Sequence, residues 1–276
     1  MRNGTFMAYR KLHQNVKAFR DYVAETAEAY VATNGGTADE AGEILKAKMV
    51  GRWQEGVPLS KAPTIRAKEE FLATFEAARD AANAWKKQAL ADGSPADLVE
   101  AEHQRRLAEA RRPFIDFTYH DDPEGVRCPV TAHIRRTNTR DMLDAGNGTS
   151  ILNNRRRILC RGLPYGSAPE GTTDEEEHGV VFLAFYARLF RQFEFIQQQW
   201  LNYGLDFNAG NDGCPLLGNR DGDNAKFVIA VDGTNGKAPF ICASMPQFVE
   251  TRGGEYFFVP SLTALRMIAM GTVDPT

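Results

Sequence analysis

The segment Val180–Tyr186 (VVFLAFY) is an unbroken run of aliphatic and aromatic residues, and it decides the fold class. A run of this length and composition is typical of a buried β-strand. An amphipathic helix over Phe190–Trp200 (FRQFEFIQQQW) follows it closely. Strands mixed with helices of very different lengths indicate an α+β fold rather than a regular βαβ repeat.

Further strands are predicted on both sides of this segment. Short Val-, Ile- and Phe-rich segments alternate with Gly, Asn and Asp turns, which predicts strands at Lys226–Val231, Phe240–Ala243 and Glu255–Val259. Another helix is expected after Pro260. Near the beginning of the chain, Thr5–Leu12 is predicted to be a strand because of its aromatic content. On it Phe6, Ala8 and Arg10 alternate with Met7, Tyr9 and Lys11.

A long helical region, at about residues 13–111, separates the first strand from the others. Its most specific signal is Thr37, which is followed three residues later by Glu40 and so forms a capping box. His103 lies on a charged stretch of this region and is expected to be solvated. Helices are predicted at His13–Asn34, from the Thr37 cap to about Gly51, at Ala67–Leu90, and at Pro95–Arg111 with Ser94 as the cap.

Composition narrows the class of protein and its partners. The chain has 276 residues, of which 43% are hydrophobic, and its formal net charge of -3 gives no argument for nucleic acid. The arginines at 155–157 and 161 are interrupted by Ile158 and Leu159, so a basic footprint is missing. No apolar run approaches the roughly 18 to 20 residues that span a bilayer. We expect neither a nucleic-acid nor a membrane partner.

Cysteine usage and the N-terminal sequence indicate a reducing compartment. Cys128, Cys160, Cys214 and Cys242 are widely spaced, with no C-x-x-C pair. The residues after Met1 lack the apolar run and small-residue cleavage site of a secretory signal. We expect a soluble cytoplasmic protein.

The stretch Cys128–Arg140 (CPVTAHIRRTNTR) carries the clearest chemical signal. It holds one histidine, His133, and three arginines within the next seven positions. Haem iron is often held by a single histidine, and the two haem propionates need cations that arginine matches with a planar fork. The alternative is that His133 is an ordinary surface or hydrogen-bonded histidine.

Several separate strings, in the same order, resemble the dye-decolorizing peroxidase family. They are GTFMAYRKLHQNVKAF (4–19), KMVGRWQEGVPL (48–59), CPVTAHIRRTNTR (128–140), ILCRGLPYG (158–166), FRQFEFIQQQW (190–200), PLLGNRDGDNAKF (215–227) and RGGEYFFVPSLTAL (252–265). The resemblance covers essentially the whole chain. It implies a haem b peroxidase built from two ferredoxin-like α+β domains. Residues 1–276 resemble its C-terminal haem-binding domain, so we expect the N-terminal domain, with the distal aspartate, to be absent from this chain.

The resemblance also implies roles for individual residues. His133 matches the proximal haem ligand, and its second ring nitrogen needs a hydrogen-bond acceptor. Glu194 is our candidate for that acceptor, the alternative being that it faces water on an amphipathic helix. Arg135, Arg136 and Arg140 are the candidates for the propionates, the alternative being surface salt bridges.

A second arginine cluster departs from the family pattern. Family members commonly read R-R-G-x-P-Y-G, with an arginine that stabilises negative charge on the distal side of the haem. Here Cys160 takes the first position, and of the pair only Arg161 remains. Arg161 is therefore our candidate catalytic residue, and Arg157 is the alternative substitute. The pattern G-x-x-D-G at Gly218–Gly222 is interpreted as a turn, so Asp221 is not taken for the distal acid.

These observations predict a haem peroxidase that uses hydrogen peroxide to oxidise dyes, phenolics or other bulky one-electron donors. The alternative is a haem-binding domain without peroxidase turnover, because the distal aspartate is missing and Cys160 replaces an arginine. An isolated half would expose the surface that normally meets the other domain, so we also expect a homo-oligomer.

Overall fold

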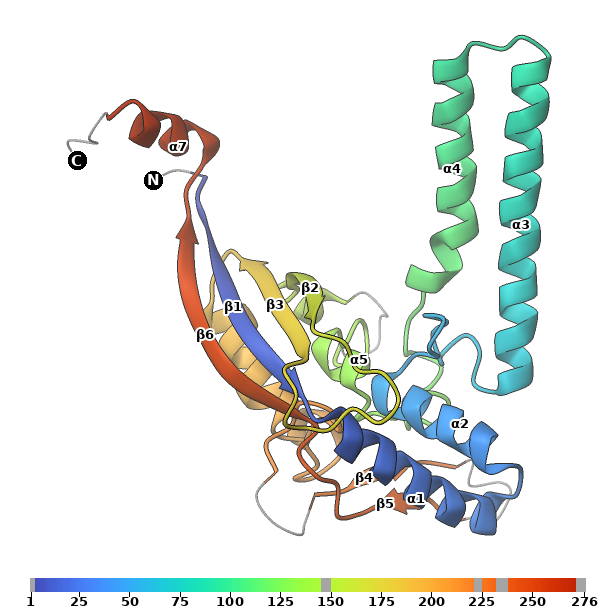
Figure 1. Ribbon diagram of the computed structural model, residues 1–276, viewed down its shortest axis with the longest axis vertical. Helices are drawn as coiled ribbons and strands as arrows, with labels where there is room; N and C mark the ends of the chain where they lie inside the picture. The colour runs from blue at the N-terminus through green and yellow to red at the C-terminus, as the bar shows by residue number, and fades with distance from the viewer. Residues whose placement is uncertain (1–2, 145–149, 221–224, 232–237, 272–276) are drawn as a thin grey trace.

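A four-stranded antiparallel sheet forms one side of the protein in the computed structural model (Figure 1). The structure describes residues 3–144, 150–220, 225–231 and 238–271. The sheet has the order β2-β3-β1-β6 and is built from β1 (Thr5–Gln14), β2 (Leu159–Tyr165), β3 (Gly179–Tyr186) and β6 (Val249–Val259). β4 (Phe227–Ile229) and β5 (Phe240–Cys242) form a separate two-stranded sheet. The predicted α+β class is confirmed.

The register of the large sheet sorts its residues onto two faces. Ala8 lies opposite Ala184 on β3 and opposite Tyr256 on β6, while Cys160 on β2 lies opposite Ala184. Directly opposed residues share a face, and neighbours along a strand point to opposite faces. Ala8, Cys160 and Tyr256 therefore lie on one face, which is the face that packs against helices.

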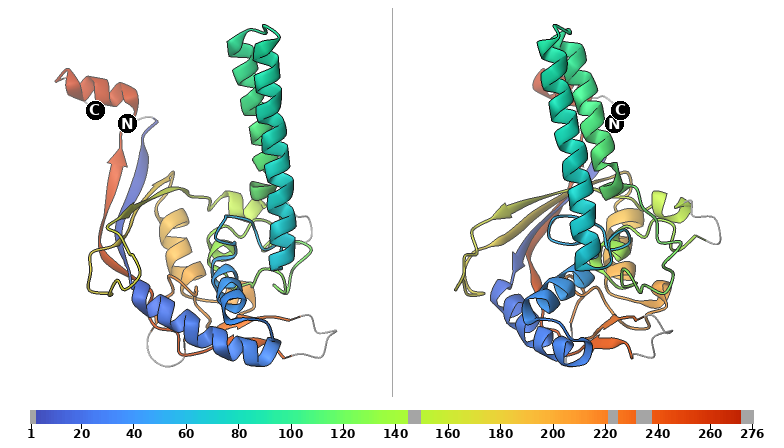
Figure 2. Two further views of the ribbon diagram at one scale, coloured as in Figure 1. Left: turned by 45° about the vertical axis from the view of Figure 1, so that its right-hand side comes forward. Right: turned by 90° about the vertical axis from the view of Figure 1, so that its right-hand side faces the viewer.

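Helices lie on that face of the sheet and below it (Figures 1 and 2). The helical segment after β3 is wide, with π-helical turns η1 (Phe190–Glu194) and η2 (Ile196–Leu201). The remaining elements are α1 (Val16–Asn34), α2 (Ala38–Val50), α3 (Ile65–Ala91), α4 (Ala96–Ile115), α5 (His133–Thr137), α6 (Ile151–Asn154), the short turn η3 (Leu205–Phe207) and α7 (Leu262–Ala269).

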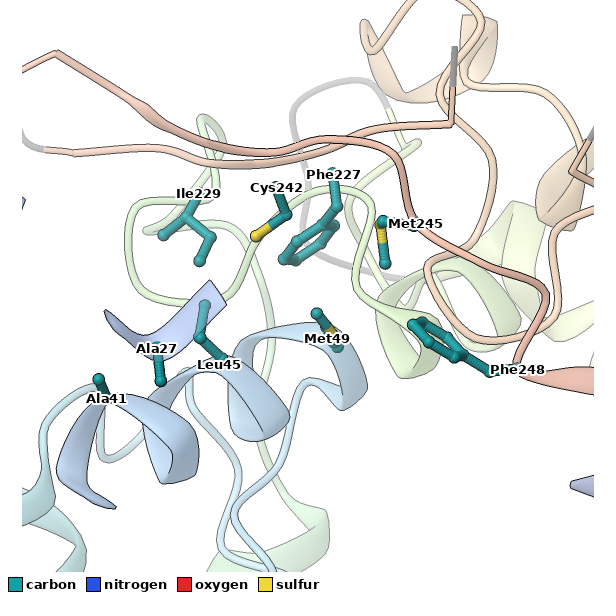
Figure 3. Close-up of a cluster of buried hydrophobic side chains, with 9 residues drawn as sticks. All are labelled: Ala27, Ala41, Leu45, Met49, Phe227, Ile229, Cys242, Met245 and Phe248. Atoms are coloured by element: carbon teal, nitrogen blue, oxygen red, sulfur yellow. The ribbon is translucent and has the colours of Figure 1, made fainter. Parts of the chain in front are cut away.

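The helical region at 13–111 divides into two parts, one packed in the body of the protein and one projecting from it. α1 and α2 belong to the body, where Ala27, Leu45 and Met49 pack against Phe227 from β4 and Phe248 (Figure 3). By contrast, α3 and α4 pack against each other and project from the body as a hairpin (Figure 2). The helical insertion that stands apart from the core is therefore this hairpin alone.

Four local predictions differ from the structure. Ser94 was predicted to cap the helix from Pro95, but α4 begins at Ala96, its N-cap residue is Pro95, and no side-chain cap hydrogen bond is present. His13 was predicted to begin a helix, but β1 continues through Gln14 and α1 begins at Val16. His103 was expected to be solvated, but it is 7% exposed, and its Nε2 lies 2.9 Å from Oδ1 of Asn83 across the hairpin. The strand β2 was not predicted, because Gly162 and Pro164 interrupt its pattern. Its place at the sheet edge is where a proline is tolerated.

Candidate functional site

A largely apolar cavity of about 340 Å³ lies between the helix-packed face of the sheet and the helices. One wall is the sheet, with Leu12, Val180 and Phe182, and the facing wall includes Phe193 and Ile196. His133 and Thr137 also line it, four residues apart on the same side of α5. Such a cavity, apolar with a few polar groups, is the usual form of a site for a bulky cofactor.

The ring of His133 is fixed by a cysteine. Its Nδ1 lies 3.2 Å from Sγ of Cys214, which is fully buried. Burial lowers the pKa of His133, but the charge and hydrogen bond of Cys214 outweigh burial, so its pKa is raised overall. Burial raises the pKa of the Cys214 thiol, and the charge and hydrogen bond of His133 reverse this, so its pKa is lowered overall.

The structure places Glu194, our candidate acceptor, near the sheet rather than beside His133. The hydrogen-bond partner of His133 Nδ1 is Cys214, and Glu194 makes no hydrogen bond to His133 among the described contacts. Glu194 lies instead near Tyr256 on β6. Burial raises the pKa of the Tyr256 phenol, Arg10 opposes that change, and Glu194 adds to it. The Glu194 carboxylate therefore lies near Tyr256 on the sheet and not beside His133.

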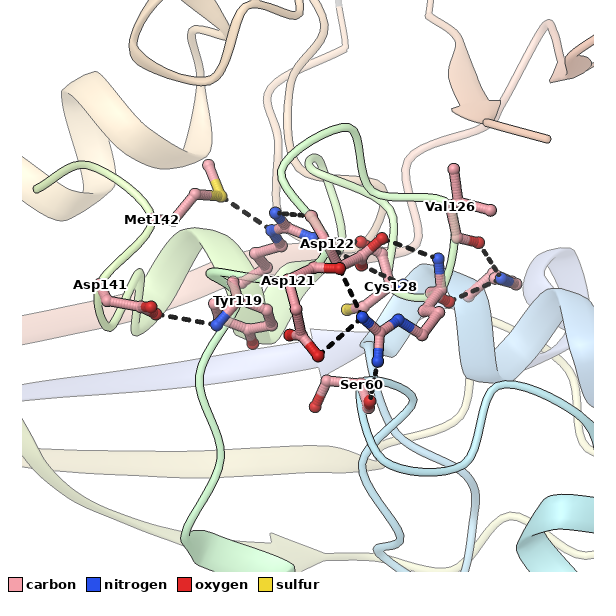
Figure 4. Close-up of polar contacts among 11 residues, drawn as sticks. Ser60, Tyr119, Asp121, Asp122, Val126, Cys128, Asp141 and Met142 are labelled. Carbon is pink, nitrogen blue, oxygen red and sulfur yellow. Dashed lines mark hydrogen bonds and ion pairs between the residues drawn. The ribbon is translucent and has the colours of Figure 1, made fainter. Parts of the chain in front are cut away.

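Arg135 is committed to protein partners and does not line the cavity. It is 0% exposed, and its Nη1 donates to Oδ2 of Asp122 at 3.0 Å and to the Cys128 carbonyl at 2.6 Å. Its Nη2 donates to the Asp122 carbonyl, and Nε contacts Sδ of Met142 (Figure 4). This placement disagrees with a propionate contact, because the guanidinium is fully buried among protein groups and does not reach the cavity.

Arg136 and Arg140 are engaged in the same way. Arg136 is 0% exposed and donates to the carbonyls of Trp200, Tyr203 and Asp212. The guanidinium carbon of Arg140 lies 3.6 Å from the Phe117 ring centroid, and Nη1 donates to the Phe117 carbonyl. Neither residue lines the cavity, so both stabilise the loops around α5.

The sheet alternation separates Cys160 from Arg161. Cys160 lines the cavity, whereas Arg161 points to the opposite, exposed face of the sheet, where Nη1 bonds the Cys160 carbonyl. This placement disagrees with a catalytic role for Arg161 on the cavity side. Asp221, which was interpreted as part of a turn, lies outside the described residues.

Arg10 is a cavity residue that the sequence analysis missed. Among the described residues that line the cavity it is the one arginine or lysine. Its guanidinium carbon lies 4.9 Å from the Phe193 ring centroid and 5.1 Å from that of Tyr256, and Nη2 donates to the Tyr256 hydroxyl at 3.3 Å. The available signal was the alternation of β1, which places Arg10 on the same face as Ala8.

The side chain of Arg10 has room because its neighbour on β6 is a glycine. Arg10 pairs with Gly254, and a Cβ at Gly254 would lie 2.5 Å from Cδ and Nη1 of Arg10 and 2.7 Å from the Tyr9 carbonyl. The adjacent Gly253 has open space around it. Of the two glycines in the RGGEYFF string, Gly254 is thus the one that the Arg10 side chain requires.

Two further structural findings concern metal-binding groups and membrane-spanning helices. Within the described residues, no group of three or more His, Cys, Asp or Glu side chains is arranged to hold a metal ion. In the same part of the chain, each helix is too short or too polar to cross a membrane.

Comparisons with known proteins agree with this description. No protein-family model matches the chain. A dye-decolorizing peroxidase of Exidia glandulosa is 31% identical over an alignment of 281 positions, which covers 96% of this chain and 45% of that protein. One of Auricularia auricula-judae is 29% identical over 95% of this chain and 46% of its own length.

Solved structures show the same relationship. A dye-decolorizing peroxidase in complex with 2,6-dimethoxyphenol matches with a TM-score of 0.64 and 27% identity, covering 95% of this chain and 51% of that one. A dye-decolorizing-type peroxidase of Anabaena matches with a TM-score of 0.63 and 26% identity, covering 96% and 46%. The chain thus spans about half the length of the relatives that it matches. By sequence and by fold, it belongs to the dye-decolorizing peroxidase family.

Proposed function

We propose that this chain binds haem b in the cavity, with His133 as the iron ligand, and that it serves a peroxidase reaction. The observation that carries the proposal is the state of His133, which lines an apolar cavity while Nδ1 is engaged by Cys214. Nε2 has no hydrogen-bond partner among the described residues and is the nitrogen left to bind iron.

The remaining lining residues fit a tetrapyrrole. Aliphatic and aromatic side chains such as Leu12, Phe182 and Leu216 suit a flat apolar ring and exclude water from it. Arg10 replaces Arg135, Arg136 and Arg140 as our candidate for a propionate, because its guanidinium reaches the cavity and is braced by two aromatic rings. Arg135 and Arg136 act instead by fixing the loops from which α5 presents His133.

Bound haem would supply the redox chemistry with hydrogen peroxide, and dyes or phenolics would be the electron donors. The name of one matched structure records a complex with 2,6-dimethoxyphenol, which is a phenolic compound. This chain would contribute the iron ligand, the orientation of that ligand, and the dry environment of the ring. We propose that residues 1–276 are the haem-binding domain in this arrangement.

A second candidate function is haem binding without turnover. The specific observation in its favour is Cys160, a thiol on the sheet side of the cavity at the position where the family resemblance implies an arginine. Arg161 lies on the other face and does not replace that charge. A thiol does not offer the fixed positive charge that stabilises developing negative charge during peroxide cleavage.

Haem titration of the purified chain, followed by absorption spectroscopy, tests haem binding. We expect a Soret band that saturates at one haem per chain and is lost in His133→Ala. The matched control is His120→Ala, which removes an exposed histidine. An unchanged Soret band in His133→Ala, or none in the folded parent chain, would contradict the proposal. Addition of peroxide and a phenolic donor then separates turnover from haem binding alone.

We also propose that the chain self-associates. The face of the sheet away from the cavity exposes Leu159, Leu163 and Phe257, which are 63%, 55% and 45% exposed. Sedimentation analysis should show dimers or larger species. A monodisperse monomer at high concentration would contradict this part of the proposal.

A further inference from the structure

We propose that Cys214 is the positioning residue of the haem ligand: its sulfur accepts a hydrogen bond from Nδ1–H of His133 and thereby keeps Nε2 free for iron. The inference rests on the proposed haem-binding function and deepens it. In metal-binding histidines the nitrogen that does not bind the metal usually donates to a carboxylate, a backbone carbonyl or water. Here the partner of that nitrogen is a thiol sulfur at 3.2 Å.

The position of the sulfur is fixed by its backbone. The Cys214 N–H donates to the Leu201 carbonyl at 2.6 Å, and the Cys214 carbonyl accepts from the Gly218 N–H at 3.0 Å and from Nη2 of Arg220 at 3.0 Å. A Cβ at Gly218 would lie 2.6 Å from the Cys214 carbonyl oxygen, so the turn closes this tightly because residue 218 is a glycine. Cys214 is therefore held at both backbone groups.

The sulfur is also held by its surroundings. Cys214 is 0% exposed and packs with Trp200, Leu201 and Phe207. The Leu217 N–H approaches Sγ at 3.5 Å, within the longer range of a sulfur hydrogen bond. Because the side chain is enclosed, it cannot rotate away from His133 without disturbing this cluster. The contact between Cys214 and His133 is therefore held in place by the surrounding structure.

A fixed partner matters because a neutral imidazole has two tautomers. One tautomer carries its proton on Nδ1 and leaves Nε2 able to bind iron, and the other does the reverse. An acceptor at Nδ1 selects the first tautomer and fixes the ring plane. A sulfur acceptor is larger and makes a longer bond than a carboxylate, so the electron donation from His133 to iron should differ from that of a carboxylate-paired histidine.

Three substitutions test the role of Cys214. Cys214→Val keeps an apolar side chain of similar size but removes the acceptor, Cys214→Ser keeps an acceptor, and Cys214→Asp supplies a carboxylate. The matched control is Cys242→Ala, because Cys242 is a buried free cysteine in another cluster. Circular dichroism and thermal melts establish that each variant is folded.

The first readout needs no haem. Nitrogen-15 NMR of the apoprotein should show the Nδ1-protonated tautomer of His133 in the parent chain, in Cys214→Ser and in the control, and a mixture of tautomers in Cys214→Val. The second readout is haem affinity, which we expect to fall about 10- to 100-fold in Cys214→Val and to be largely restored in Cys214→Ser. The third is the midpoint potential, which should change in Cys214→Asp.

The outcomes separate this inference from the function that it rests on. If the parent chain binds haem through His133 but Cys214→Val keeps the same tautomer and a haem affinity within twofold, Cys214 only packs and the inference is overturned. If the parent binds no haem, the proposed function fails, and the NMR readout still decides whether Cys214 orients His133. If Cys214→Val does not fold, Cys214→Asp carries the test, because a carboxylate that replaces the sulfur beside Nδ1 should change the midpoint potential. A midpoint potential equal to that of the parent chain would then overturn the inference.

Discussion

Two regions of this protein present arginines, and they use them differently. In the loops around α5, Arg135 and Arg136 lie two and three positions after His133, yet both are fully buried and bind carbonyls and a carboxylate. On the sheet, Arg10 is 123 positions away from His133 in the sequence, yet both line one cavity. Helical periodicity places the side chain of Arg135, at i+2, off the face of His133. Arg136, at i+3, instead donates to the carbonyls of Trp200, Tyr203 and Asp212. Proximity in sequence therefore does not identify the residues that reach the cavity.

Arg135→Ala should have the largest effect on stability. The substitution leaves Asp122 buried without its cationic partner, since the two side chains are 0% and 3% exposed. Breaking a buried ion pair by removing one partner typically costs about 3–5 kcal/mol. Urea denaturation should show a loss of that order in the free energy of unfolding. Arg111→Ala, at an exposed position of α4, is the control.

A loss below about 1 kcal/mol in Arg135→Ala would contradict this account and would return Arg135 to the candidates for ligand binding. The proposed difference between the two regions would then not hold, because the α5 arginines would matter no more to stability than a surface arginine. A large loss of stability together with unchanged haem affinity in the folded fraction would support the difference.

Gly254→Ala should have an intermediate effect and should act through Arg10. The new Cβ would collide with the Arg10 side chain and with the Tyr9 carbonyl, and the latter belongs to backbone that cannot easily move. Overpacking of this kind costs about 1–3 kcal/mol. The neighbouring Gly253→Ala is a matched control, because a Cβ there meets no atom within 4 Å.

Stability and haem affinity should both fall in Gly254→Ala and should both stay near the parent values in Gly253→Ala. Thermal melts and haem titration measure the two quantities. Equal losses at the two glycines would mean that the strand tolerates neither substitution, and that the space around Arg10 is not what distinguishes them.

The sequence predicts the features that depend on neighbours along the chain. The capping box at Thr37 and Glu40 is confirmed, with both of its hydrogen bonds present, and α2 ends at Val50 just before Gly51. A capping box can be predicted from the sequence because its side chains bond to backbone only three positions away. The strand at Val180–Tyr186 is confirmed for the same local reason.

The site is less predictable, because its contacts join distant segments. His133, our candidate for the haem ligand, lines the cavity, but its contact with Cys214 spans 81 positions and leaves no spacing signal in the sequence. His103 is buried because the hairpin folds back and brings Asn83 against it, which the charge pattern of α4 alone does not reveal. The face of Cys160 depends on the register of β2, whose strand character Gly162 and Pro164 conceal.

Arg161→Ala should have the smallest effect. Arg161 lies on the exposed face, and its described hydrogen bond is to the carbonyl of the preceding residue, so its loss should change the free energy of unfolding by less than about 0.5 kcal/mol. Haem affinity should also be unchanged, because the side chain does not line the cavity. Urea denaturation and haem titration of the variant measure both quantities.

The reactivity of the neighbouring Cys160 can be compared with the effect of Arg161→Ala, because the two residues lie on opposite faces of β2. It is the exposed member of the four free cysteines, so a maleimide should modify it first, and bound haem should protect it because it lines the cavity. Mass spectrometry with and without haem measures the protection. If Arg161→Ala weakened haem binding while Cys160 reacted equally fast in both states, the register of β2 would have to place Arg161 in the cavity. One residue of register is enough to exchange the two faces of the strand, so this pair of measurements is a direct test of which side chain the haem would meet.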